Sequence, residues 1–209
     1  MIKEHVMLKA VMAGIFIGIA GLIYLSVENK VLGALLFSFG LLMVVSKGYF
    51  LYTGKVGYLL PYTKGYLIIL GKTIIGNLIG ISLVGLLFRF SGQEVVINQA
   101  VLMVSSKLDR SWYQALILSI FCGMMMYVGV QGYKAMKLDI LKVLIVIFAV
   151  TIFILAKFEH SIANMLYFSL GNAWSFKGVF YTVIWIIGNG IGAVFLNLVE
   201  VKLSCNDRQ

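Results

Sequence analysis

The side chains best suited to chemistry gather in one short stretch, Lys157-Phe158-Glu159-His160-Ser161, which interrupts a long apolar run. His160 is one of two histidines in the chain, and histidine is the side chain whose charge changes near physiological pH. Ionisable groups inside a membrane segment usually face a cavity or one another, so we expect Glu159 and His160 beside a polar cavity. The plainer alternative is that His160 caps a helix, with Glu159 as its local partner.

A second interruption lies in the first half of the chain, where Lys47, Thr53 and Lys55 fall within another apolar run. The Thr53 hydroxyl can donate to an anion or cap a helix, and taken alone the cap is the better hypothesis. Paired with His160, a role in a pore becomes the better one. Lysines near the two interruptions, including Lys157, either attract anions or extend to a membrane interface, and the sequence leaves both open.

The elements that must position these side chains are membrane helices. Of the 209 residues, 61% are hydrophobic and only 12% are charged. A soluble fold of this size cannot hide so much apolar surface, because its own surface must remain wetted. A spanning helix needs about 20 mostly apolar residues, so the chain has room for about six. With Pro61 as its only proline, the chain shows no proline-rich linker, and residues 1–209 are predicted to form one transmembrane domain.

Six apolar segments fit this count, and they repeat after three. The second and fifth contain the polar interruptions, and the third and sixth each contain the pattern Gly-Asn-x-Ile-Gly. Repeated spans with corresponding broken helices are typical of inverted-repeat channels and transporters, whose sites lie where the broken helices meet. The fold class expected is therefore all-α integral membrane, with six transmembrane helices and repeat halves of about 6–90 and 111–203. The spans are expected at residues 6–27, 31–60, 66–88, 111–133, 141–170 and 179–203.

The charges of the chain fix its expected orientation. The net charge is +9, but the lysines are scattered singly between apolar runs, so we predict a lipid membrane and no nucleic acid as partner. Placing both termini in the cytoplasm puts more loop lysines and arginines inside than outside, as membrane topology favours. We expect a multi-pass protein of the cell membrane. The polar stretch 89–110 is interpreted as the longest connection.

Several motifs resemble those of one known family. Residues 158–165 read Phe-Glu-His-Ser-Ile-Ala-Asn-Met, which resembles the fifth-span signature of formate/nitrite transporters. Residues 37–41 and the following Gly48, Leu51 and Thr53 are similar to that family's second span and loop. The two Gly-Asn motifs, at 76–80 and 188–192, are similar to its third and sixth spans. The resemblance covers nearly the whole chain.

The resemblance implies a homopentamer of six-span protomers with an aquaporin-like inverted repeat and one pore in each protomer. It makes His160 the central pore histidine and Thr53 its partner, with Asn164 and Glu159 close by and Lys107 at the outer vestibule. Two constrictions are implied as well. The outer one consists of Phe37 and Phe153, and the inner one of Leu41, Leu51, Tyr52 and Met126.

The chain departs from the family pattern at a few positions that bear on substrate choice. Gly123 falls where many members carry a pore asparagine, and Phe50 replaces an acidic residue. Tyr52 replaces phenylalanine, and Lys157 stands where small residues are usual.

The function predicted is a channel for small monovalent weak-acid anions, with formate as the first substrate and proton transfer through His160. Nitrite and hydrosulfide are alternatives within the family. A neutral small-solute channel of aquaporin-like shape and a non-transporting scaffold are alternatives from other classes. No enzyme is predicted, and no catalytic residue, metal site or cofactor, because phosphate-binding, metal-ligand and nucleophile motifs are missing from the sequence. Glu159 and His160 are neighbours that do not face each other on a helix, which argues against a catalytic dyad.

Overall fold

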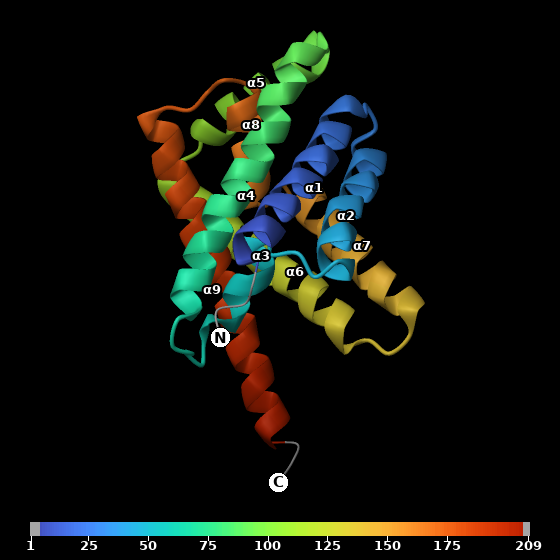
Figure 1. Cartoon of the computed structure of the whole chain (residues 1–209), viewed down its shortest axis with the longest axis vertical. Helices are drawn as coiled ribbons and strands as arrows, with labels where there is room; N and C mark the ends of the chain where they lie inside the picture. Colours follow the sequence, from blue (N-terminus) through green and yellow to red (C-terminus); the bar gives the residue numbers. More distant parts are fainter. Residues whose placement is uncertain (1–4, 207–209) are drawn as a thin grey trace.

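The computed structural model describes residues 5–206, and every regular element within this range is a helix (Figure 1). The longest helix, α9 (Phe176–Asn206), extends below the rest of the molecule in this view. In lipid a helix satisfies all of its backbone groups internally, which is why apolar sequences of this kind form helices. The prediction of an all-α architecture is confirmed for the described residues.

Four helices are long and apolar enough to cross a bilayer: α1 (Val6–Ser26), α4 (Tyr66–Phe88), α6 (Trp112–Ala135) and α9. Their mean hydropathy over the most apolar window runs from 1.7 to 2.3. Many large apolar side chains on their outer surfaces are exposed, as expected for helices that face lipid.

The remaining apolar segments form shorter pieces. In the first half, α2 (Lys30–Ser46) is followed by the single turn α3 (Tyr52–Lys55) and the 3₁₀ helix η1 (Val56–Leu59). In the second half, α7 (Asp139–Leu155) is followed by α8 (Ser161–Leu170). The helix ends fall beside the polar stretches that the sequence singled out.

The stretch interpreted as a polar connection contains a helix that the sequence analysis missed. After the 3₁₀ helix η2 (Arg89–Ser91), α5 runs over Glu94–Leu108. Its buried side chains include Val96, Ala100 and Val104, four residues apart, so they line one helical face. The charged and polar residues between them concealed this amphipathic pattern.

The long helices pack in two equivalent pairs, α1 with α4 and α6 with α9. Glycines of the repeated motif bring the backbones together in each pair. A Cβ atom at Gly80 would lie 2.0 Å from the Val11 carbonyl oxygen, and one at Gly192 would lie 2.0 Å from the Ile120 carbonyl oxygen. Any side chain at these two positions would therefore push the helices apart.

The short helix α8 lies at the centre of the molecule. All ten of its residues are buried, and it packs against α1, α4, α5 and α9. A helix sealed on every side has a fixed position, so the residues at its N-terminal end are held in place by the surrounding bundle.

Candidate functional site

His160 is the N-cap residue of α8, and both of its ring nitrogens have partners. The backbone N–H of Ala163 donates to Nδ1 over 3.1 Å, and Nε2 lies 3.1 Å from the Thr53 hydroxyl oxygen. An amide N–H can only donate, so Nδ1 must accept, and the proton of the neutral ring lies on Nε2. His160 is 2% exposed and presents this N–H to Thr53.

The pair of Thr53 and His160 joins the two polar stretches, which are 107 residues apart in the chain. The structure brings these two predicted site residues together. It also shows that His160 caps α8, so the alternative of a capping role holds alongside the contact with Thr53. Thr53 does not cap α3, because it lies inside that helix. The N-cap residue of α3 is Leu51, whose side chain makes no capping hydrogen bond.

Glu159 is a fully buried carboxylate with three partners. Its Oε2 accepts from Lys107 Nζ at 2.6 Å and from Asn164 Nδ2 at 2.7 Å. Its Oε1 accepts from Arg110 Nη1. A buried charge is tolerated only when it is paired and hydrogen-bonded, and this carboxylate meets both conditions. The predicted residues Glu159, Asn164 and Lys107 thus form one cluster beside His160.

Arg110 is a member of this cluster that the sequence analysis missed, since it treated residues 89–110 only as a polar connection. Arg110 lies in the turn between α5 and α6, and its carbonyl oxygen accepts a hydrogen bond from the Tyr181 hydroxyl. Lys107 and Arg110 are three residues apart, the spacing of neighbours on a helix. Arg110 lies beyond the end of α5, however, so prediction of that helix would not have identified it.

The asparagine of the first Gly-Asn motif, Asn77, holds the chain just before α3. The backbone N–H of Tyr52 donates to Asn77 Oδ1 at 2.9 Å, and Asn77 Nδ2 donates to the Phe50 carbonyl at 2.7 Å. The same Nδ2 donates to the Ala10 carbonyl of α1 at 2.8 Å. One side-chain amide therefore bonds two backbone groups of the irregular junction and ties them to a carbonyl of α1.

The asparagine of the second motif, Asn189, does the same before α8. The Ser161 N–H donates to Asn189 Oδ1 at 2.9 Å, and Asn189 Nδ2 donates to the carbonyl oxygens of Glu159 and Ser119, each at 2.8 Å. The sequence analysis used both motifs only as markers of a repeat. An amide has two donors and an acceptor, which makes it suited to an irregular backbone inside a protein.

A cavity of about 180 Å³ opens beside His160 and is called here the histidine cavity. Glu159 is not among the residues that line it. Its lining includes five of the predicted site residues together with cationic and aromatic neighbours: Lys107, Phe37, Phe153, His160 and Asn164, then Arg110, Lys157, Tyr24 and Tyr167.

Aromatic rings narrow the histidine cavity. The rings of Phe37 and Phe153 meet edge to face with their centroids 6.1 Å apart. The Phe153 ring also lies 5.5 Å from the His160 ring. The two residues predicted as one constriction therefore contact each other, and Phe153 lies directly beside the histidine.

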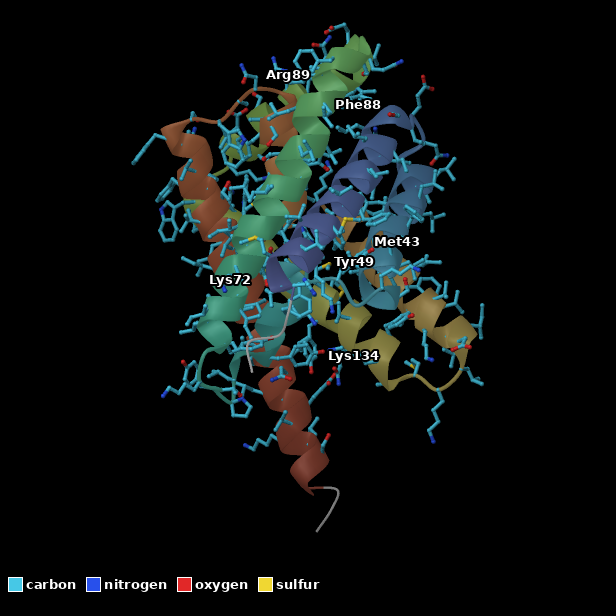
Figure 2. The ribbon with its side chains drawn as sticks, in the orientation of Figure 1. Met43, Tyr49, Lys72, Phe88, Arg89 and Lys134 are labelled. Carbon is cyan, nitrogen blue, oxygen red and sulfur yellow. The ribbon has the colours of Figure 1, made fainter. Side chains whose placement is uncertain are left out.

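A second cavity, of about 350 Å³ and called here the lysine cavity, is lined by Lys55, Lys134 and Lys142 with Tyr49 and Tyr133. Figure 2 shows Tyr49 and Lys134 in the part of the molecule away from Arg89. The histidine cavity is lined by Phe153, near the C-terminal end of α7, whereas the lysine cavity is lined by Lys142, near the N-terminal end of the same helix. The two cavities therefore open toward opposite ends of the bundle.

The four residues predicted as the second constriction are all buried. Leu51 lines the lysine cavity, whereas Leu41, Tyr52 and Met126 are not among the lining residues of either cavity. The Tyr52 hydroxyl donates to the Ile186 carbonyl of α9 at 2.9 Å, which fixes its ring against that helix. Gly123 lies against α9 too, where a Cβ would meet the Asn189 carbonyl oxygen at 2.1 Å.

Apolar helices whose irregular junctions meet at a buried polar cluster define a membrane channel or transporter as the class of protein. The family described as "Formate/nitrite transporter" matches residues 2–201. The chain belongs to this family, and it is a multi-pass membrane protein.

Curated relatives are similar over most of the chain. The formate channel FocA of Haemophilus influenzae is 28% identical over 154 residues, which is 68% of this chain and 54% of the relative. The formate channel FocA of Escherichia coli K12 is 29% identical, covering 78% of this chain and 64% of its own length. The nitrite transporter NirC of the same organism is 28% identical, covering 91% of this chain and 80% of NirC. The chain thus spans less than two thirds of the length of these formate channels.

Solved structures share the fold. One described as an "FNT family ion channel" has a TM-score of 0.81 at 21% identity and covers 94% of this chain and 89% of its own. Another, a "Pentameric formate channel with formate bound", has a TM-score of 0.75 at 23% identity and covers 96% of this chain and 97% of its own.

Proposed function

We propose that this protein is a channel for small monovalent weak-acid anions, with formate as its first substrate and proton transfer at His160. The observation that carries the proposal is the position of His160, which is buried and lines a cavity with the cations Lys107, Arg110 and Lys157. A cationic cavity concentrates anions, and a histidine at its end is suited to exchange a proton. Membership of the formate/nitrite transporter family supports the same substrate class.

The membrane arrangement proposed is one transmembrane domain of six spans, built from inverted halves of about 6–90 and 111–203. The second span would consist of α2, α3 and η1, and the fifth of α7 and α8. The equivalent bonds of Asn77 and Asn189 support this pairing. Both termini would lie in the cytoplasm of a cell-membrane protein, as the positive charges of the loops favour.

The assembly proposed is a homopentamer in a lipid membrane, with a pore in each protomer. The support is the similarity in fold to a solved pentameric formate channel over 96% of this chain. The pore would run within one protomer, from the histidine cavity to the lysine cavity.

Two constrictions are proposed along this pore. Phe37 and Phe153 would form one at the histidine cavity, where their rings touch. The other would lie between the two cavities and consist of apolar or aromatic side chains: Leu41, Leu51, Tyr52 and Met126.

The mechanism proposed follows from the cost of moving a bare anion through an apolar constriction. Lys107 helps to concentrate the anion, while Glu159 and Asn164 hold Lys107 in place. The proton affinity of the anion rises as it leaves water, and the anion then takes a proton from His160 Nε2, or from water held there. A proton from the water on the entry side replaces the one given away, so the ring of His160 is neutral before and after the transfer. Thr53 accepts from His160 Nε2 and keeps that N–H directed into the pathway. The neutral acid crosses the second constriction and ionises again beyond it.

The test is flux into liposomes that contain purified protein and a pH-sensitive dye. Formate, nitrite and hydrosulfide are added in turn to vesicles with wild-type protein or the His160→Asn variant. We expect one anion to move rapidly with wild type and the accompanying change in internal pH to be lost in the variant. An unchanged pH dependence in His160→Asn rules out proton transfer at this residue.

Nitrite is the second candidate substrate. The similarity to NirC of Escherichia coli supports nitrite, because this chain covers 80% of NirC and 64% of the formate channel FocA of the same organism. The same liposomes separate the two, because each anion is presented alone. Hydrosulfide is the third anion of the series. Movement of glycerol or urea without movement of any anion would instead identify a neutral-solute channel.

A further inference from the structure

The charges around Glu159 do not cancel. One carboxylate binds two cations, Lys107 through Oε2 and Arg110 through Oε1. A lysine paired with a glutamate is neutral as a unit, so the added guanidinium leaves this cluster with one net positive charge. A guanidinium cannot be deprotonated in a protein, so this charge persists at any physiological pH.

The positive members of the cluster reach the histidine cavity, whereas the negative one does not. Glu159 is completely buried, while the side chains of Lys107 and Arg110 are 10% and 24% exposed and line the cavity. Asp109, which precedes Arg110 in the sequence, is exposed and is not among the residues that line the cavity. An anion that enters this cavity therefore meets cations before the carboxylate behind them.

Lys157 adds a second uncompensated charge to the same cavity, at a strained position. Its backbone has φ of 57°, in the left-handed region that non-glycine residues rarely adopt. Lys157 lies two residues before Glu159, whose carbonyl Asn189 binds. Gly48, with φ of 64°, lies two residues before Phe50, whose carbonyl Asn77 binds. The first junction thus uses glycine where the second uses lysine. Backbone strain that persists in this way points to a function for the side chain.

From these observations we propose that Arg110 and Lys157 determine the anion affinity of the histidine cavity. Glu159 offsets one of the two cations that bind it, so the presence of Arg110 leaves this cluster with one net positive charge, and Lys157 adds a second. This net charge reaches the cavity through Lys107, Arg110 and Lys157 and captures a small monovalent anion next to His160. The inference rests on the proposed function and names two residues that set its affinity for the anion.

The experiment measures how tightly the anion is captured. Formate flux into liposomes is recorded against concentration at low ionic strength for wild type, Arg110→Gln, Lys157→Gln and the double variant. We expect each single change to raise the concentration for half-maximal flux about fivefold, as the loss of one nearby unit charge should do. The double variant should show roughly the product of the two, and the differences should shrink in high salt. The maximal flux should change much less.

Three controls separate charge from structure. Arg110→Lys keeps the charge and should stay close to wild type. Arg89→Gln removes a cation that does not line the cavity and should have no effect. Lys157→Gly should weaken anion capture while raising the melting temperature, since glycine tolerates this backbone conformation. If the charge of Lys157 plays no part in capture, the variant should raise the melting temperature and leave the concentration for half-maximal flux unchanged.

A binding titration keeps the inference testable apart from transport. The affinity of purified wild-type and variant protein for ¹³C-formate is measured by NMR. If wild type transports no anion, the proposed function fails, and the titration alone decides the role of Arg110 and Lys157. Equal formate affinity in wild type and the double variant, or no binding by wild type, would overturn the inference.

Discussion

The two junctions between helices, before α3 and before α8, share one backbone frame and differ in chemistry. In each, an asparagine bonds a carbonyl and an N–H two residues apart, together with a carbonyl of α1 or α6. The residue whose carbonyl is bound is Phe50 in the first junction and Glu159 in the second. Each asparagine bonds only backbone groups of its junction. The side chain of the residue whose carbonyl is bound can therefore differ between the two junctions.

Cations lie beside both of these positions, although they come from different elements of the two halves. The ammonium groups of Lys9 and Lys55 lie 5.7 Å and 4.3 Å from the centre of the Phe50 ring. Lys107 and Arg110 bind the Glu159 carboxylate directly. A ring face attracts a cation more weakly than a carboxylate does. The same backbone arrangement therefore carries ion pairs beside His160 in the second junction and weaker contacts between cations and an aromatic ring in the first.

Removing the two asparagines should have the largest effect. Asn77→Ala and Asn189→Ala each leave three backbone groups without the amide, and we expect losses of about 4 kcal/mol in stability for each. Thermal unfolding in detergent measures this, with the exposed Asn98→Ala as the control. If only one of the two variants is destabilised, the frames are not equivalent.

Removing the charge of Glu159 should cost somewhat less. Glu159→Gln leaves Lys107 and Arg110 without a carboxylate, and we expect a loss of about 3 kcal/mol. Phe50→Leu, at the matching position, removes the contacts of the ring with two cations and part of its packing against Val6 and Ala10, and should lose about 1 kcal/mol. The difference between the two melting temperatures is the measure of how unlike the junctions are. Equal losses of stability would show that the charge of Glu159 contributes no more to stability than the Phe50 ring does at the matching position.

Crowding the helix pairs should have a similar effect in both halves. Gly80→Ala and Gly192→Ala each place a methyl group 2.0 Å from a carbonyl oxygen, and we expect each to lose about 2 kcal/mol or more. Gly71→Ala is the matched control, because a Cβ there meets no other atom within 4 Å. That variant should be neutral or slightly stabilised, since alanine favours the helix.

Exchanging the left-handed residues should have the smallest effect, with opposite signs. We expect Lys157→Gly to stabilise the protein by about 1 kcal/mol and Gly48→Lys to destabilise it by about the same amount. The two melting temperatures in detergent test this. A gain in stability from Gly48→Lys would contradict the equivalence of these positions.

Hydropathy was enough to predict an all-α membrane protein, and single polar residues in apolar runs marked where helices end. The bounds predicted for the third span, 66–88, match α4. The amphipathic α5 escaped notice because its polar residues hid a buried face of Val96, Ala100 and Val104. Motif resemblance supplied the site residues, yet it gave no reason to include Arg110, which lies in a turn.

The sequence by itself determined that this chain belongs in a membrane, that it repeats, and that His160 stands at a polar interruption. These properties follow from local composition, because apolar runs partition into lipid and polar residues interrupt them wherever the chain folds. Only the tertiary structure decided which groups meet. Thr53 reaches His160 across 107 residues of chain, and Arg110 reaches Glu159 across 49. Such pairings depend on how helices pack around α8, and a buried carboxylate takes whichever cations that packing places beside it.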